Sequence, residues 1–94
     1  MIIVSGRIFL RPGTRQRFLT SSVEAVARAR RTRGCFDFAV SADPIDPDRV
    51  NVYEQWESEE ALLAFRGEGP DEDLTSNIER AEVSRHVVSS SGPA

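Results

Sequence analysis

The residues on either side of Trp56, the only tryptophan of the chain, follow two different periodicities. Residues 49–57 alternate as a strand does, whereas residues 58–67 carry their apolar side chains at helical spacing. Ser58 is a residue type that accepts a hydrogen bond in the first turn of a helix, and Gly67 is one that ends helices. The chain is therefore expected to pass from strand to helix here, with Trp56 where a sheet meets a helix.

The same two periodicities divide the rest of the chain. Two-residue alternation predicts strands over residues 2–10, 35–42 and 81–89, and helical spacing predicts a long helix from Thr14 to near Gly34 and a short one over residues 71–79. The prolines and acids of residues 43–48 predict a loop that joins two antiparallel strands. The order strand, helix, strand, strand, helix, strand predicts an α+β fold of the ferredoxin-like βαββαβ type, with helices on one face of a four-stranded antiparallel sheet.

A chain of 94 residues has room for one domain, which we place at residues 1–88, with residues 89–94 as a flexible C-terminal tail. No apolar run is long enough to cross a membrane, and the first residues lack the regions of a signal peptide, so a cytoplasmic location is expected. The formal charge of −3 and the lack of aromatics among the arginines argue against nucleic-acid binding. One histidine and one cysteine, Cys35, give no recognisable metal site, and Cys35 is expected to be a small core residue.

Both faces of the first predicted strand carry apolar side chains. Ile2, Val4 and Ile8 point to one face, and Ile3 and Phe9 point to the other. Because the helices can cover only one face of the sheet, the second face needs another cover. A second copy of the chain, packed sheet to sheet, is the simplest one, so we expect a homodimer through the sheet faces.

Several short stretches carry a resemblance to a known family. They are Arg11-Pro12-Gly13, Gly34-Cys35, Ser41-Ala42-Asp43-Pro44, Asp46-Pro47 and, most specifically, Glu54 to Leu62, where Glu-x-Trp-x-Ser precedes Ala-Leu. On these residues the chain resembles, over almost its whole length, the antibiotic biosynthesis monooxygenase family and its quinol-monooxygenase-like members. The resemblance implies small ferredoxin-like subunits whose two sheets join into a dimeric α/β barrel.

The resemblance also implies a chemistry. Several members of that family oxidise phenols or hydroquinones to quinones with O2 and no cofactor, whereas relatives bind and degrade haem or have no known reaction. Many relatives carry a histidine three residues after the leucine of the Ala-Leu pair, where this chain has Phe65. That departure speaks against a histidine-dependent reaction and against haem ligation.

Trp56 and Glu54 are the first candidate catalytic residues. An indole can stack on a flat aromatic substrate or donate a hydrogen bond to its oxygen, although a core tryptophan that fills the layer between sheet and helix fits the pattern equally well. Glu54 lies two residues before Trp56 and shares its strand face, where an acid among apolar side chains is unusual. Poor solvation would raise its pKa and make it a base, whereas an ion pair with Arg7 or Arg85 would make it structural.

His86 is the third candidate catalytic residue, because histidine is suited to proton transfer near neutral pH. A plain strand or interface residue is the alternative, and the alternation of this strand places His86 on the face opposite Arg85. The candidate substrate-binding residues could wall an apolar pocket or simply fill the core, with an arginine at the rim: Phe36, Phe38, Leu62, Phe65 and Arg66.

The sequence therefore leads to one principal hypothesis for function. It is a cofactor-independent monooxygenase that oxidises a small aromatic phenol or hydroquinone to a quinone with O2. The alternative is a non-catalytic dimeric module of the same fold that binds a small aromatic ligand. A haem-binding or haem-degrading protein is a third, weaker alternative.

Overall fold

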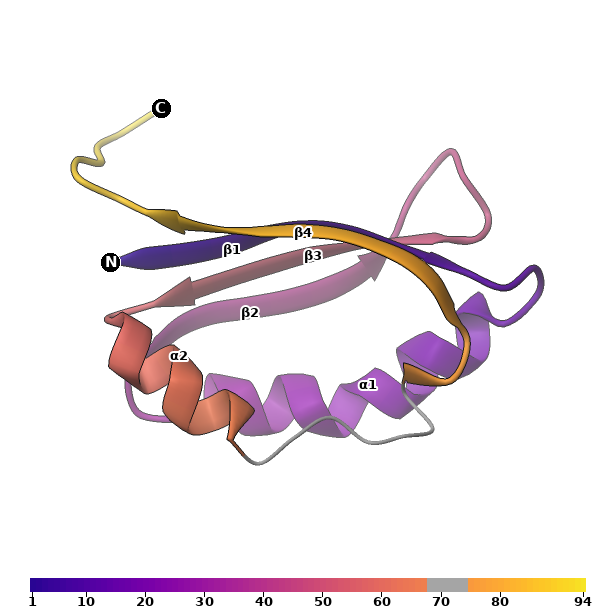
Figure 1. Ribbon diagram of the computed structural model, residues 1–94, viewed down its shortest axis with the longest axis horizontal. Coiled ribbons are helices and arrows are strands. Elements are labelled where there is room, and N and C mark those ends of the chain that lie inside the picture. Colours follow the sequence, from indigo (N-terminus) through magenta and orange to yellow (C-terminus); the bar gives the residue numbers. More distant parts are fainter. Residues whose placement is uncertain (68–74) are drawn as a thin grey trace.

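The structure, a computed structural model, describes residues 1–67 and 75–94. Its elements follow the predicted order (Figure 1): β1 (Ile2–Leu10), α1 (Arg15–Arg30), β2 (Cys35–Ala42), β3 (Arg49–Trp56), α2 (Glu59–Arg66) and β4 (Ile78–Val87). The strands form one four-stranded sheet in the order β2-β3-β1-β4, with all neighbours antiparallel. The α+β ferredoxin-like fold predicted from the sequence is thereby confirmed.

Helices α1 and α2 lie on one face of the sheet, and the residues that the structure describes leave the other face open (Figure 1). The register places Ile3, Ser5 and Arg7 of β1 on this open face, beside Tyr53 and Asn51 of β3. Neither α1 nor any other helix of the described residues has the length and apolar character needed to span a bilayer.

The largest differences from the predicted boundaries are at the end of α1 and the start of β4. Helix α1 ends at Arg30, and residues 31–34 form a turn that closes at Gly34, whose φ is 90°. Strand β4 starts at Ile78 because that residue pairs with Leu10 and packs into the core, so residues 78–79 belong to a strand and not to the predicted helix over 71–79. The first part of that predicted helix, residues 71–74, lies outside the described residues.

Strand β2 contains a bulge that changes which side chains face the helices. Cys35 pairs with Trp56 and Asp37 with Gln55, so the β2 segment holds one extra residue, Phe36. Phe36 is 59% exposed. Simple alternation along residues 35–42 would place Phe36 on the same face as Phe38, but the bulge turns Phe36 to solvent, so it does not fill the core beside Phe38.

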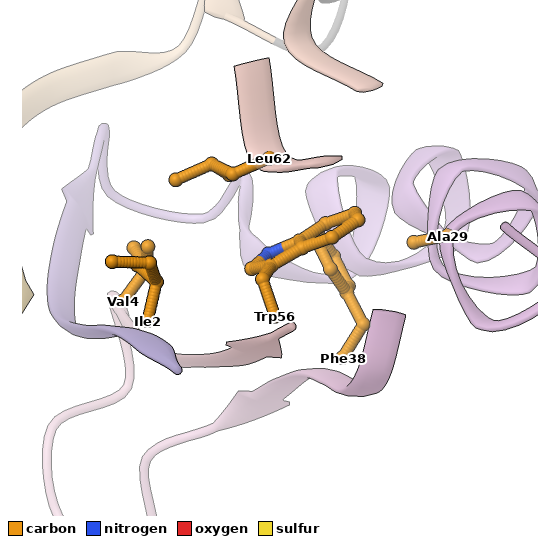
Figure 2. Packing of buried hydrophobic residues seen from close by; sticks show 6 residues of the cluster. All are labelled: Ile2, Val4, Ala29, Phe38, Trp56 and Leu62. Carbon is orange, nitrogen blue, oxygen red and sulfur yellow. The ribbon is translucent and has the colours of Figure 1, made fainter. Parts of the chain in front are cut away.

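The core between sheet and helices has two neighbouring clusters of buried side chains. The smaller one is built on Leu10, Phe18 and Val50. The larger one surrounds Trp56 and is drawn in Figure 2; it contains Ile2, Val4, Ala29, Phe38, Trp56 and Leu62.

Gly6 allows β4 to approach β1 closely. Its φ is +155°, and a Cβ atom at this position would overlap the backbone of β4 at the Glu82 carbonyl oxygen and the Val83 Cα. Only a residue without a side chain fits here.

The β2–β3 loop, residues 43–48, rises on the side of the sheet away from the helices (Figure 1). It is held by hydrogen bonds from the loop backbone and from β3. The Asp43 carboxylate accepts hydrogen bonds from the backbone N–H groups of Ile45 and Asp46 and from Asn51 Nδ2, at 3.1, 2.8 and 3.0 Å. These bonds favour the ionised carboxyl, and the one from Asp46 contributes most to lowering the pKa of Asp43 from 3.8 to about 2.

Candidate active site

Trp56 lies at the centre of the layer between the sheet and the helices and has no exposed surface. Figure 2 shows its indole between Leu62 on one side and the strands on the other, with Ala29 of α1 near its benzo ring. Phe38 meets it edge to face, with ring centroids 6.5 Å apart and planes at 86°. Since Trp56 is enclosed, a ligand can reach it only if a covering side chain moves.

Helix α2 supplies that cover, and its start is fixed by the predicted cap. The Ser58 hydroxyl accepts a hydrogen bond from the backbone N–H of Ala61 at 3.2 Å. One turn of helix then carries Leu62 into a fully buried position against Trp56. The cap at Ser58 and the helix that follows it thus place Leu62 over Trp56.

Phe65, where many relatives carry histidine, completes an aromatic cluster of Phe38, Trp56 and Phe65. Its ring centroid lies 5.2 Å from that of Trp56 and 5.8 Å from that of Phe38. The Arg28 guanidinium carbon lies 4.4 Å above the same ring, within cation–π distance. In this chain the position therefore contributes packing, and its outer face binds a cation of α1.

Glu54 lies beside Trp56 on the helix-facing side of β3, as the alternation predicted. It is 8% exposed, and its Oε1 accepts a hydrogen bond from Trp56 Nε1 at 3.0 Å. Burial raises the pKa of the Glu54 carboxyl, and the indole hydrogen bond and the positive charge of Arg66 offset only part of that rise. The group is thus a carboxyl that releases its proton at a higher pH than an ordinary glutamate does.

The ion pair of Glu54 with Arg7 or Arg85, the structural alternative raised by the sequence, is not formed within residues 1–67 and 75–94. Arg7 pairs with Glu82 at 2.9 Å on the open face. Arg85 pairs with Glu59 at 2.6 Å. The indole is the hydrogen-bond donor that Glu54 has instead.

His86 lies on the other face of the sheet from Glu54 and Trp56. It pairs with Ile3, on the open face, while Arg85 pairs with Val4 on the helix-facing side. A single subunit therefore separates the third candidate catalytic residue from the first two.

The candidate substrate-binding residues divide in the same way. Phe38, Leu62 and Phe65 gather around Trp56, whereas Phe36 projects to solvent at the bulge. Arg66 is exposed at the end of α2, and its charge still acts on Glu54. Among the described residues, no group of three or more His, Cys, Asp or Glu side chains is arranged to hold a metal ion.

One feature of the surface was not anticipated from the sequence. A hollow of about 370 Å³ lies between α1 and β2, and its lining residues are Leu19, Ser22, Val23, Val26, Ala27, Arg30 and Val40. Val23 is 63% exposed there. The apolar residue Val23 was the available signal in the sequence. The sequence alone does not say which side of the helix the sheet leaves uncovered.

Comparison with known proteins agrees with this architecture. The family model described as antibiotic biosynthesis monooxygenase matches residues 1–70. No functionally curated protein matches the chain.

Solved structures match over nearly the whole chain. A protein of Nitrosomonas europaea named as a candidate antibiotic biosynthesis monooxygenase has a TM-score of 0.82 at 13% identity, covering 96% of this chain and 100% of its own. One of Deinococcus radiodurans with the same kind of name has a TM-score of 0.81 at 16% identity, with 100% and 98% covered. One of Chloroflexus aurantiacus has a TM-score of 0.77 at 24% identity, with 98% and 96% covered. At these identities the likeness establishes a shared fold.

Proposed function

Because the chain belongs to the antibiotic biosynthesis monooxygenase family, we propose that it is a cofactor-independent monooxygenase that oxidises a small phenol or hydroquinone to a quinone with O2. In this reaction a phenol and O2 give a quinone and water. One oxygen atom is bonded to a ring carbon, and the other leaves as water with the phenolic and the ring hydrogen. The substrate itself supplies the electrons, so the protein has only to remove a proton and hold the ring away from water.

The observation that carries the proposal is the buried carboxyl of Glu54. It is 8% exposed, burial raises its pKa, and it accepts a hydrogen bond from Trp56, whose indole packs against the rings of Phe38 and Phe65. A base with a pKa moved toward the working pH is an effective acceptor for a phenolic proton. Perturbed carboxyls of this kind gather at functional sites more often than elsewhere.

In the proposed mechanism the Glu54 carboxylate takes the phenolic proton, and the phenolate formed reacts with O2. Trp56 Nε1, which donates to Glu54 at 3.0 Å, fixes the direction of the carboxylate. Phe38 and Phe65 provide apolar surface against which a flat ring can stack. Glu54 returns its proton as water leaves, so the protein ends the cycle unchanged.

The proposed assembly is a homodimer through the open faces of two sheets. Ile3, Phe9 and Tyr53 give this face its apolar surface, and they are half-buried in one subunit. His86 stands on the same face, so in such a dimer it would lie at the interface and away from Glu54 of its own subunit. Size-exclusion chromatography with light scattering tests the assembly, and a monomer at micromolar concentration would contradict it.

Oxygen consumption with a panel of hydroquinones and anthrones tests the reaction. We expect turnover that Glu54→Gln lowers by about 10²- to 10⁴-fold, the usual contribution of a general base. Glu57→Gln is the matched control, because this exposed acid follows β3 directly. Oxygen uptake that does not exceed the rate in buffer for any compound would refute the proposal.

The second candidate function is a non-catalytic module that binds small aromatic ligands. The observation in its favour is the complete burial of Trp56 beneath Leu62. Ligands that raise the melting temperature without any oxygen consumption would favour this alternative. Titration with haem separates the third alternative, since a haem-binding protein shifts the haem absorption band.

A further inference from the structure

Beyond Ile78, the helix-facing side of β4 is exposed at its valines, and the described residues leave it less covered than the same side of β1. Val83 and Val87 are 36% and 80% exposed, whereas Ile2 of β1, the partner of Val87, is only 5% exposed. Arg85 lies between the two valines on this side and is paired with the buried Val4. A cation with apolar neighbours therefore borders the layer that holds Glu54.

Among residues 1–67 and 75–94, Arg85 pairs with one acid, Glu59 of α2. Its Nη1 contacts Glu59 Oε1 at 2.6 Å, and the two side chains are 44% and 51% exposed. Glu59 is the first residue of α2, so this ion pair ties β4 to the helix that covers Trp56. An exposed ion pair contributes little net stability, so another carboxylate can replace Glu59 at Arg85 with little cost.

The side of α2 that carries Glu59 also carries an apolar residue and a second cation. Leu63 and Arg66 follow Glu59 by one and two helical turns, which puts them on that side of the helix. Leu63 is 52% exposed. The positive charge of Arg66 acts on the buried carboxyl of Glu54 and lowers its pKa, against the larger effect of burial.

Arg85 and Glu54 lie in one row across the sheet, separated only by Val4. Paired residues of antiparallel strands have Cα atoms about 5 Å apart, which puts these two about 10 Å apart. A benzene ring with one oxygen-bearing substituent at each end can bridge two long side chains over such a distance. Guanidinium groups bind carboxylates with two parallel hydrogen bonds, which favours a carboxylate as the outer substituent.

We propose that the substrate is an aromatic acid whose carboxylate displaces Glu59 from Arg85, with Arg66 as a second cation and the phenolic end directed toward Glu54. This inference rests on the proposed function for the identity of the reacting end. Displacement of Glu59 also breaks the tie between α2 and β4. Leu62 can then move away from Val4 and Trp56, which opens the way for the ring.

The test compares 2,5-dihydroxybenzoate with its methyl ester, measured by calorimetric titration of the full chain under anaerobic conditions. We expect the acid to bind more tightly than the ester. Arg85→Gln is expected to weaken binding of the acid on the order of tenfold, the usual effect of losing a charge-assisted hydrogen bond. Glu59→Gln is expected to tighten it about two- to fivefold, because the competing acid is gone. The ester has no carboxylate for Arg85, so it should respond equally to the two variants, which both release α2 from β4.

The two variants control for each other, because both break the same ion pair. If the pair were only structural, both variants would change binding of the acid in the same direction. If Arg85 contacts the ligand, Arg85→Gln weakens binding and Glu59→Gln tightens it. Arg80→Gln is a further control, since Arg80 is an exposed arginine on the other face of the same strand. Equal affinity for acid and ester, no binding of either, or a loss of acid binding in Glu59→Gln would each overturn the inference. Binding is measured without O2, so selective acid binding with no later oxygen consumption would refute the proposed reaction and leave the anion site standing.

Discussion

Replacement of Glu54 by Gln and by Met separates the two roles that the buried carboxyl has in the structure. Gln keeps an oxygen that can accept the hydrogen bond from Trp56 Nε1, but it cannot ionise. Met has a similar length and shape and offers only a weak acceptor. Both variants remove the proposed base, so differences in stability between them report on the hydrogen bond alone.

The expected magnitudes follow from burial. Trp56 has no exposed surface, so in Glu54→Met its N–H group loses its acceptor with no access to water. A buried donor without a partner costs about 1–3 kcal/mol, and Glu54→Met should be less stable than Glu54→Gln by this amount. Glu54→Gln should be at least as stable as the wild type at pH 7, because it avoids ionising a carboxyl in the core.

The pH dependence has a defined sign. Burial raises the pKa of Glu54 above the 4.5 of an ordinary glutamate, so above pH 4.5 the folded chain keeps a proton that the unfolded chain releases. The stability of the wild type relative to Glu54→Gln is therefore greatest at about pH 4.5 and below. This relative stability falls by about 1.4 kcal/mol for each pH unit between the pKa of Glu54 in the unfolded chain and its pKa in the folded chain. Above the folded pKa it is constant.

Urea unfolding followed by far-ultraviolet circular dichroism, from pH 4 to pH 8, measures all three proteins. The protein concentration must be the same throughout, because the stability of a dimer depends on it. A difference between wild type and Glu54→Gln that stays constant with pH, or that grows in favour of the wild type as the pH rises, would refute the reasoning. So would equal stability of the Gln and Met variants.

Three further predictions concern the scaffold. Gly6→Ala should lower the free energy of unfolding by about 1–3 kcal/mol, because its Cβ would meet the Glu82 carbonyl. Thermal unfolding measures this, with Gly67→Ala as the control, because a Cβ there meets nothing closer than 3.5 Å. Equal losses of stability in the two variants would contradict the prediction. Ser58→Ala should cost about 0.5–2 kcal/mol through loss of the α2 cap, and full stability in urea unfolding would argue against that role. Asp43→Asn should be less stable than the wild type above about pH 4, because the loop hydrogen bonds stabilise the ionised Asp43 carboxylate. This difference in stability should vanish as the pH falls toward 2 and Asp43 takes up a proton. An acid titration in which the difference persists would contradict the prediction.

Local patterns in the sequence were sufficient for most of the fold. The start of α2 just after Ser58 and the shared face of Glu54 and Trp56 depend on residues within one turn or one strand, where periodicity and capping preferences act directly. The opposed faces of Arg85 and His86 were predictable for the same reason.

Features that depend on pairing between distant segments could not be predicted. The bulge at Phe36 exists only in the register of β2 against β3, so alternation alone placed this side chain in the core. Arg7 pairs with Glu82 and Arg85 with Glu59 because the fold makes their strands and helices neighbours. Nothing in the sequence around Glu82 or Glu59 identifies either acid as the partner of a distant arginine. The roles of those two arginines therefore appear only once the chain is folded.

The buried indole of Trp56 also gives this chain an intrinsic fluorescence signal that reports on the proposed site. As the only tryptophan, it is the single source of indole emission, and that emission shifts to longer wavelength when unfolding exposes the ring to water. Its N–H group is bonded to the one carboxyl proposed to exchange a proton. Protonation of Glu54, movement of Leu62 and quenching by a stacked quinone would therefore all alter the same signal, so the proposed catalytic cycle can be followed in the unlabelled protein in real time.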